Sequence, residues 1–508
     1  MKKILRFLIS RVFWFSLLIV VQIGIFAVIL FNISSYSTYL YAAFVLFSLI
    51  IVIWLVAKDD NPSYKITWII LIMTLPVVGW FFYLKFGNKT LPHRYWEKIA
   101  ANEAAHPALF TAEEGDTAAL LEQYPHHRVL TDYIRNISGF PAYGGTQVEY
   151  APLGEDFFRQ LMRELPKAKK FIFLEYFIVR EGYMWGRILE ILKEKVNAGV
   201  EVRVLYDGTC AVALLPYSYP QKLEKLGIAC KMFAPLRPFV STHYNYRDHR
   251  KIMVIDGQIA FTGGVNLADE YINKIVRFGY WKDSGVRLDG PGAASLANIF
   301  LTFWKAKYPD EDLDAGCDLP AAVPVETDCL VQPFADTPVD REAVAKNVYL
   351  ELINQAQKRL YICTPYLILD NDLLSCLRLA AKRGVDVRIY TPGVPDKPTI
   401  YQLTRSYFPH LLRAGVKIYS YTPGFLHAKT WLVDDRIAAV GTVNLDYRSL
   451  YLHFENSVLL YGGAVLDDVR RDLAEIEKES AAVTLADCRT GFFGTLYSAV
   501  LRLVAPLC

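Results

Sequence analysis

One short pattern occurs twice in the 508 residues, and this repetition constrains the fold more than any other feature of the chain. In both copies a lysine stands two positions after a histidine and an aspartate seven positions after it: His249, Lys251 and Asp256, then His427, Lys429 and Asp434. The segments 263–266 (Gly-Gly-Val-Asn) and 441–444 (Gly-Thr-Val-Asn) follow at the same offset. A single short motif carries a false-positive risk, but two copies with matching flanks indicate internal duplication.

The flanking sequence repeats in the same order. Strand-like runs at 171–177, 198–206 and 226–230 match runs at 360–366, 383–391 and 414–418. In the second pair, Gly199 and Gly384 stand where a helix would end before a strand begins. Strands that alternate with helices predict an α/β fold made of two similar halves, each a β-sheet flanked by helices, preceded by an N-terminal helical membrane anchor.

Composition divides the chain further. The first 90 residues are strongly apolar, and a stretch rich in Asp, Pro and Ala separates the two repeats. The predicted organisation is a hydrophobic membrane anchor at 1–90, a connector at 91–145, a first repeat half at 146–308, a linker at 309–341, a second repeat half at 342–480 and an apolar C-terminal segment at 481–508, which could lie on the membrane surface.

Three apolar stretches form the predicted anchor: Val12–Phe31, Tyr39–Val56 and Ile66–Leu84. Each is close to the ~20 residues that a helix needs to cross a bilayer. The third contains Pro76 and Gly79, which leaves open a kinked span or a re-entrant hairpin. We therefore expect two or three spans, and a multi-pass protein of the cell membrane.

The side of the membrane that holds the catalytic halves stays open. Basic residues near the N-terminus favour a cytoplasmic start, but basic residues also follow the third apolar stretch, and these signals conflict. At the other end, Gly491–Ala505 is apolar with a single charge. It is either a helix that lies in the membrane surface or one that packs on the domain.

The motif residues suit phosphate chemistry. Residues at i and i+2 of a strand point to the same face, so each histidine and its lysine would share one site. A lysine and a neutral amide can both hold phosphate oxygens. The candidates for substrate contact beside the lysines are Asn266, Asn444, Gly264 and Thr442, where small side chains would admit a ligand.

Two kinds of acid accompany the histidines. Asp256 and Asp434 stand where a β-hairpin would turn, and that position predicts a role in fixing the turn. Asp283 and Glu455 each open a later strand-like run at a similar distance from the preceding histidine. A carboxylate on the far imidazole nitrogen sets the tautomer of a histidine and stabilises its charged form, which is the role predicted for this pair.

The paired motifs resemble those of the phospholipase D superfamily. The flanks at 144–150, 173–177, 245–251, 424–429 and 444–449 narrow the resemblance to bacterial cardiolipin synthases, from the second apolar stretch to near the C-terminus. The stretch 12–31 is additional to the two spans usual in that family. The resemblance implies that both complete motifs, aspartates included, are catalytic, and that Arg405 and Tyr407 contact lipid headgroups.

The resemblance also implies the reaction: two phosphatidylglycerol molecules give cardiolipin and glycerol, with no metal and no other cofactor. His249 would be the nucleophile, forming a phosphatidyl-histidine, and His427 the acid and base. The partners expected are the phospholipid substrate and the membrane.

Three other functions use the same residues. A hydrolase would pass the intermediate to water, and an inactive membrane scaffold would keep the motifs without turnover. A nuclease is disfavoured by the apolar stretches and by a net charge of only +3, so nucleic acid is not an expected partner. The sequence does not predict the oligomeric state.

Overall fold

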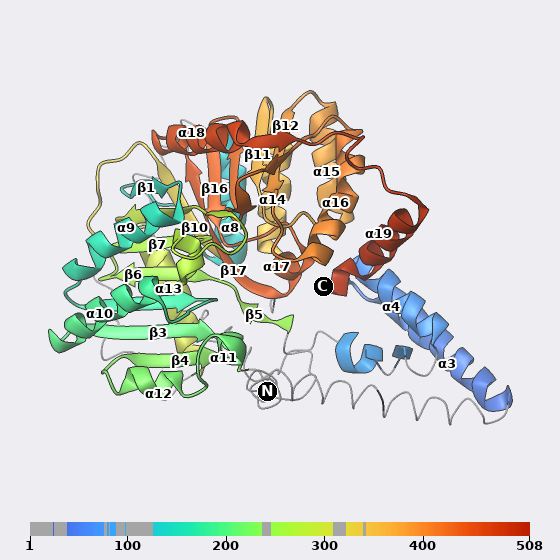
Figure 1. The fold of residues 1–508 in the computed structure, drawn as a ribbon, viewed down its shortest axis with the longest axis horizontal. Coiled ribbons are helices and arrows are strands. Elements are labelled where there is room, and N and C mark those ends of the chain that lie inside the picture. The colour runs from blue at the N-terminus through green and yellow to red at the C-terminus, as the bar shows by residue number, and fades with distance from the viewer. Residues whose placement is uncertain are drawn as a thin grey trace.

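The computed structural model describes residues 38–75, 79–80, 82–87, 125–235, 245–307, 322–338 and 342–507, together with Gly24 and Glu97. Two β-sheets, each with helices packed on its faces, make up most of the molecule, and helices from both ends of the chain meet at one side (Figure 1). The α/β fold predicted from the sequence is confirmed.

The first sheet has seven strands in the order β1-β9-β7-β6-β2-β3-β4. Their bounds are β1 Gln147–Ala151, β2 Phe171–Tyr176, β3 Glu201–Asp207, β4 Ala229–Phe233, β6 Lys251–Ile255, β7 Ile259–Gly263 and β9 Gly285–Asp289. Strands β2, β3 and β4 are parallel, whereas β6, β7, β9 and β1 continue the sheet in antiparallel pairs.

The second sheet repeats this order as β10-β17-β16-β15-β11-β12-β13, with β18 added at its edge and the two-residue β5 paired to one end of β17. The bounds are β10 Leu330–Asp336, β11 Arg359–Cys363, β12 Asp386–Pro392, β13 Lys417–Tyr421, β15 Thr430–Val433, β16 Ile437–Gly441, β17 His453–Tyr461, β18 Ser480–Ala482 and β5 Arg247–Asp248. Seven strands in one order on both sides are the structural form of the duplication.

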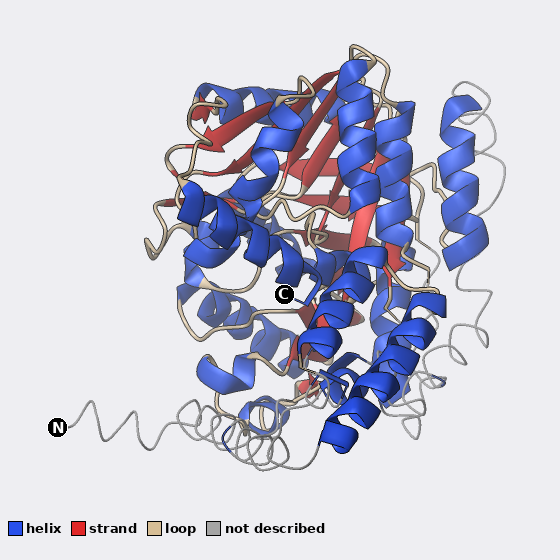
Figure 2. Ribbon diagram, turned by 90° about the vertical axis from the view of Figure 1, so that its right-hand side faces the viewer, coloured by secondary structure: helices blue, strands red, loops and turns tan. Residues whose placement is uncertain are grey.

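Helices connect the strands and cover the sheets (Figure 2). In the first half they are α9 Gly154–Glu164, α10 Tyr183–Asn197, α11 Cys210–Ala213, α12 Tyr219–Glu224 and α13 Ala293–Lys307. In the second half they are α14 Val344–Gln355, α15 Asn371–Lys382, α16 Pro398–Leu412, α17 Tyr447–Tyr451 and α18 Val465–Lys478. The sequence sets their limits locally: Asp370, for example, caps α15 by accepting a hydrogen bond from the Leu373 amide at 2.9 Å.

The first sheet separates two hydrophobic cores. Phe171 and Phe173 of β2 belong to the core that α13 shares with the second half, while Ile172 and Leu174 belong to the core beneath α9 and α10. This alternation follows from the two-residue period of a strand. Because α13 also contacts β10, and α18 contacts β1, each half is packed against the edge strand of the other.

One helix and one strand lie in the ranges predicted to be a connector and a linker. Helix α8, Pro125–Ser138, lies within 91–145, and its Leu130 and Ile134 are fully buried in the core of the second half. Strand β10 lies within 309–341. The described part of each connection therefore contributes to the second sheet and its core.

The N-terminal helices lie beside the C-terminus (Figure 1). Helix α3, Thr38–Ala57, packs on α4, Pro62–Thr74, which contacts α19, Phe492–Val504. Within the part of the chain that the structure describes, no helix has both the length and the apolarity needed to cross a bilayer. The predicted first span, 12–31, lies outside the described residues apart from Gly24.

Candidate active site

Each motif histidine is held by backbone from the opposite half. Strand β5, just before His249, pairs with the start of β17, and the His249 amide donates to the Phe454 carbonyl at 2.9 Å. Strand β14, Gly424–Leu426, just before His427, pairs with β8, Tyr280–Lys282, and the His427 amide donates to the Lys282 carbonyl at 2.7 Å. Both histidines therefore lie at the seam between the repeats.

Each imidazole is also bonded to a carboxylate of the opposite half. Asp283, from the first half, lies with its Oδ2 2.6 Å from Nδ1 of His427. Glu455, from the second half, lies with its two carboxylate oxygens 3.0 and 2.9 Å from Nδ1 of His249. Both carboxylates are completely buried. Each pair fixes Nδ1 as the bonded nitrogen, which leaves Nε2 of each ring for chemistry.

The two motif lysines are buried beside the histidines. Lys429 Nζ lies 2.9 and 3.0 Å from the two ring nitrogens of His427, and Lys251 Nζ donates to the carbonyl of His249. Burial lowers the pKa of Lys251 to about 7 and that of Lys429 to about 8. In both cases the buried carboxylates partly offset the cost of burying the charge.

Both imidazoles are neutral near pH 7 in the ligand-free site. Burial holds the pKa of His249 well below its usual value, and the two lysines and the other histidine add to this effect. Burial and the charge of Lys429 lower the pKa of His427 to about 4, against the opposing effect of Asp283. A protonated His427 would also lower the pKa of His249, so the two rings are coupled electrostatically across the seam.

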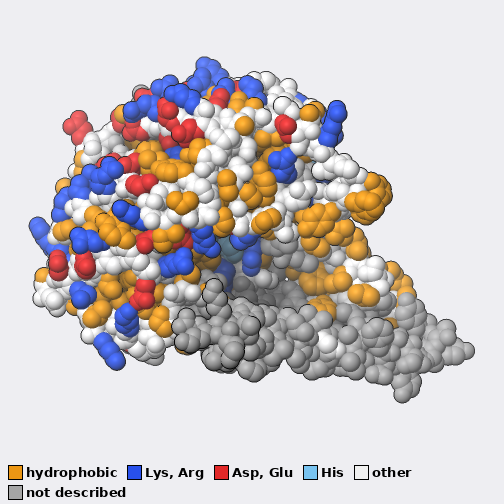
Figure 3. Space-filling model, viewed as in Figure 1, with side chains coloured by type: hydrophobic (Ala, Val, Ile, Leu, Met, Phe, Trp, Pro, Cys, Tyr) orange, Lys and Arg blue, Asp and Glu red, His pale blue; other side chains and the backbone are white. Residues whose placement is uncertain are grey.

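Figure 3 shows histidine side chains lying in a hollow of the surface, with Lys and Arg side chains beside them. A phosphodiester anion in this environment would offset the positive charges that depress the histidine pKa values. The arrangement can thus hold a phosphate group between two imidazoles and two ammonium groups.

Gly264 and Thr442 occupy equivalent positions in the two repeats, and each lies against the carboxylate, Asp283 or Glu455, that bonds a histidine. A Cβ atom on Gly264 would lie 1.9 Å from Oδ1 of Asp283, so only glycine leaves room for this carboxylate. Thr442 instead donates its hydroxyl to Glu455. Both were predicted as substrate contacts, and the structure places them behind the carboxylates that hold the histidines.

The motif asparagines differ in their contacts. Asn266 accepts a hydrogen bond from the Ile178 amide at 2.9 Å and donates to the Tyr271 hydroxyl at 2.7 Å. The side-chain oxygen of Asn444 is buried without a hydrogen-bond partner among the described residues. The side-chain amide of Asn266 is therefore occupied by protein contacts, whereas the side-chain oxygen of Asn444 can still accept a hydrogen bond.

The motif aspartates hold the fold of the hairpins. Asp256 has φ 53° and accepts backbone N–H groups of residues 169–171, at 2.7 to 2.9 Å. Asp434 has φ 53° and accepts those of residues 357–359, at 2.7 to 2.8 Å. No described contact joins either carboxylate to an imidazole. These contacts favour the turn-fixing role that their position predicts, and the catalytic role implied by the resemblance stays a prediction.

Arg405 and Tyr407 lie on α16, and no described contact links either to the histidines. Arg405 donates to the carbonyl of Asp487 at 2.6 Å. Tyr407 is buried and packs beneath the guanidinium of Arg502, whose central carbon is 4.9 Å from the ring centroid. The structure thus does not bring these two predicted lipid contacts into the histidine site.

Two aromatic neighbours of the histidines were missed from the sequence. Trp281 lies 5.3 Å from the His427 ring, and His453 lies 5.5 Å from the His249 ring, measured between centroids. Each stands two residues before the supporting carboxylate, so the aligned repeats held the signal that could have found them.

Three groups beside the first histidine could together hold a metal ion. His249, His453 and Glu455 offer ligand atoms within 4.8 Å of one another.

Comparison with known proteins agrees with this geometry. The family described as "Cardiolipin synthase, PLD-like domain" matches residues 161–277 and 349–476, and an N-terminal phospholipase D-nuclease family matches residues 43–88. A cardiolipin synthase of Geobacillus sp. (strain WCH70) is 37% identical over 430 residues, covering 84% of this chain and 85% of the relative. The chain belongs to the cardiolipin synthase family of the phospholipase D superfamily.

Other members extend the comparison. A cardiolipin synthase of Halalkalibacterium halodurans is 37% identical over 406 residues, 80% of each chain. An uncharacterised protein of Streptococcus mutans serotype c is 45% identical over 459 residues, which are 90% of this chain and 99% of the relative. The crystal structure of a Haemophilus influenzae phosphatidylserine synthase superposes with a TM-score of 0.58 at 18% identity, covering 75% of this chain and 98% of the other, and shows the shared fold.

Proposed function

We propose that this protein is a phosphatidyltransferase that makes cardiolipin and glycerol from two molecules of phosphatidylglycerol. The observation that carries the proposal is the reciprocal support of the two histidines. Each imidazole is bonded through Nδ1 to a buried carboxylate of the other half, and a buried lysine accompanies each ring. Membership of the cardiolipin synthase family supplies the substrate class.

In the first step, Nε2 of His249 attacks the phosphorus of one phosphatidylglycerol. The bond from phosphorus to the headgroup glycerol breaks, and protonated His427 gives its proton to the departing oxygen. The products are glycerol and a phosphatidyl group bound to His249. Glu455 stabilises the positive charge that develops on the His249 ring because it accepts from Nδ1.

In the second step, a hydroxyl of the second phosphatidylglycerol attacks the same phosphorus. Neutral His427 takes the hydroxyl proton, the bond from phosphorus to nitrogen breaks, and cardiolipin leaves with both histidines restored. Lys251 and Lys429 stabilise charge on the phosphoryl oxygens in both steps. The proton count is unchanged over one cycle.

The pKa values of the two histidines are shifted in the same direction. Asp283 opposes the lowering of the His427 pKa, which stays near 4, while the pKa of His249 lies well below its usual value. A bound phosphodiester raises both pKa values. Because Glu455 holds Nδ1 of His249 as Asp283 holds Nδ1 of His427, the assignment of His249 as nucleophile and His427 as acid and base follows the family resemblance.

We infer that the N-terminal region anchors the enzyme in the cell membrane. Side chains of α3 and α4 present large apolar groups outward, including Ile53 at 70%, Val56 at 57% and Ile66 at 51% exposure. Exposed apolar surface of this extent marks contact with lipid or with another protein. The lipid substrate of the family favours the bilayer.

Product analysis tests the proposal. Purified protein is incubated with phosphatidylglycerol labelled in the headgroup glycerol, and lipid and water-soluble products are quantified. We expect cardiolipin and free glycerol in equal amounts. Phosphatidic acid as the main lipid product would instead make the protein a hydrolase, and turnover by His249→Ala would exclude the covalent step.

A further inference from the structure

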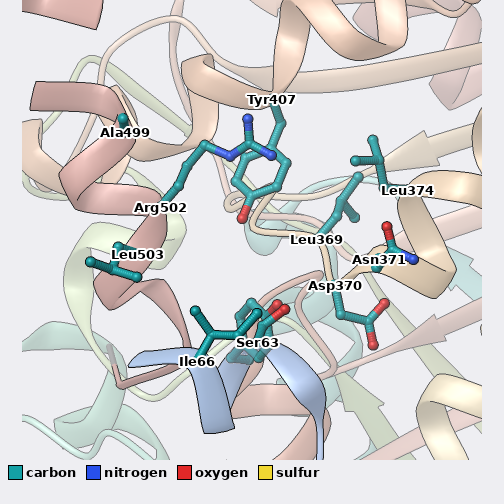
Figure 4. Close-up of a pocket in the computed structure, with 11 residues that line it drawn as sticks. Ser63, Ile66, Leu369, Asp370, Asn371, Leu374, Tyr407, Ala499, Arg502 and Leu503 are labelled. Carbon is teal, nitrogen blue, oxygen red and sulfur yellow. The ribbon is translucent and has the colours of Figure 1, made fainter. Parts of the chain in front are cut away.

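A separate cavity of about 320 Å³ lies where α4, α15, α16, α17 and α19 meet (Figure 4). Its walls combine polar groups, such as Ser63, Asn371 and Arg502, with apolar ones, such as Ile66 and Leu503. The volume is at the lower end of the range typical of small-molecule sites, enough for a headgroup. None of the residues that line it belongs to the two histidine motifs.

Arg502 provides a positive charge that no acid balances. Figure 4 shows its side chain extending from α19 toward the Tyr407 ring. Its Nη1 lies 2.7 Å from Nε2 of His410, and no carboxylate within the described residues lies at ion-pair distance from it. A guanidinium has five N–H donors, so several remain for a ligand.

Further positive charges lie near His410, the residue that contacts Arg502. Burial lowers the pKa of His410, and the guanidinium groups of Arg502, Arg413 and Arg378 lower it further. His410 is therefore neutral and accepts a hydrogen bond from Arg502. Arg413 and Arg378 are exposed, and neither forms an ion pair among the described residues. Arg502 on α19, Arg413 after α16 and Arg378 on α15 thus all act on His410, and none has an acidic ion-pair partner among the described residues.

The one carboxylate in the cavity wall is already neutralised. Asp370 lies 2.9 Å from Nζ of Lys346, accepts a hydrogen bond from the Tyr451 hydroxyl and caps α15 through the Leu373 amide. In Figure 4 its carboxylate is turned away from Arg502. The net field at Arg502 is therefore positive and favours an anion.

Apolar side chains are exposed on the two helices that contribute walls from the ends of the chain, α4 and α19. On α19, Phe492 is 77% and Phe493 82% exposed, and Leu496 is 52% exposed. On α4, Met73 is 44% exposed, and the two helices are joined where Thr67 donates to the carbonyl of Leu503 at 2.6 Å. An anion-binding cavity beside an uncovered apolar surface has the polarity pattern of an anionic lipid at a bilayer surface.

We propose that this cavity is an accessory binding site for the phosphate headgroup of an anionic phospholipid, with the acyl chains along the apolar faces of α4 and α19. The site does not require the transfer reaction: a bound lipid here would fix the catalytic domain against an anionic bilayer. It joins the N-terminal helices to the second catalytic half, because α4 contributes one wall and α15 and α16 the other.

Phosphatidic acid is the probe of choice, because it has no head alcohol to lose and no headgroup hydroxyl to accept a phosphatidyl group. The full-length protein is held in a neutral detergent, and bound lipid is counted by native mass spectrometry during titration with phosphatidic acid or phosphatidylcholine. Arg502→Gln removes the charge, and Ile66→Trp fills the cavity without a charge change. Arg489→Gln is the matched control, since Arg489 is exposed on the segment before α19 and does not line the cavity.

We expect wild type and Arg489→Gln to bind phosphatidic acid in preference to phosphatidylcholine. Arg502→Gln should lose roughly tenfold in affinity for phosphatidic acid, the effect of one hydrogen bond to a charged group. Ile66→Trp should lose as much or more. Unchanged binding in both variants overturns the proposal. Turnover of phosphatidylglycerol by the wild type, measured in parallel, separates this outcome from a failure of the proposed enzymatic function.

Discussion

Each histidine is bonded to a carboxylate of the other half, and this pairing predicts a result that a pairing within one half would not. Asp283→Asn should impair the chemistry of His427, although the two residues are 144 positions apart, and leave the environment of His249 intact. An amide can no longer accept the Nδ1 proton with a negative charge, and its nitrogen favours the wrong imidazole tautomer.

The size of the effect follows from the contact. The Asp283 carboxylate is completely buried and lies 2.6 Å from a largely buried imidazole. A hydrogen bond to a charged group contributes about 1.5–3 kcal/mol, which corresponds to a loss of roughly 10- to 150-fold in rate. Loss of the correct tautomer can raise this to about 10⁴-fold, as in serine hydrolases.

Two measurements check it. Steady-state turnover of phosphatidylglycerol gives kcat for Asp283→Asn and for the surface control Asp467→Asn, whose side chain is 64% exposed in an ion pair with Arg470. NMR of protein labelled with ¹⁵N-histidine reports the tautomer of each ring. A shift of the His249 signals with those of His427 unchanged, or a loss of less than threefold in kcat, would refute the reciprocal pairing.

Three further results are expected. Gly264→Ala should lose at least about tenfold in kcat, because the added methyl displaces Asp283, whereas Thr442→Ser, which keeps the hydroxyl on Glu455, should stay within threefold of wild type; equal kcat in the two variants would contradict this. The pKa values of Lys251 and Lys429, about 7 and 8, mean that the free enzyme loses these positive charges between pH 7 and 9, so kcat/KM should fall there as pH rises. In the complex with an anionic substrate both lysines keep their charge to higher pH, so kcat should stay constant to higher pH. A kcat/KM that is flat to pH 10 would contradict this. Asp256→Ala removes the acceptor of three backbone N–H groups and should lower the free energy of unfolding by roughly 1–3 kcal/mol in thermal denaturation, with kcat of the folded protein within threefold of wild type; a loss of kcat comparable to that of a histidine variant would return Asp256 to the reaction.

The sequence predicted what is local. The motif hairpin is confirmed: β6 and β7 pair in antiparallel register, and both Asp256 and Gly257 at the turn have positive φ, as the Asp-Gly pair favours. The positions of the strands along each repeat likewise follow from short-range patterns of apolar residues. These features depend on neighbours a few positions apart, which a pattern records.

The partners of the histidines could not be predicted in the same way. Asp283 and Glu455 were found as candidates because they recur, but the sequence offers no means of telling which histidine each one meets. That depends on how β8 pairs with β14 and β5 with β17, contacts that arise only when the two halves dock. The cavity beside Arg502 has the same origin, since its walls come from both ends of the chain.

The duplicated site is symmetric in backbone but not in chemistry. At matched positions His427 faces Trp281, while His249 faces His453, whose Nδ1 lies 3.5 Å from Oε1 of Glu455. Burial lowers the pKa of His453 to about 3, so this second ring is neutral at physiological pH. His249 therefore has a neighbour with a ring nitrogen that can accept a hydrogen bond, whereas the indole of Trp281 beside His427 can only donate one. Because two interacting imidazoles titrate as a pair, a difference between their surroundings decides which ring holds the first proton.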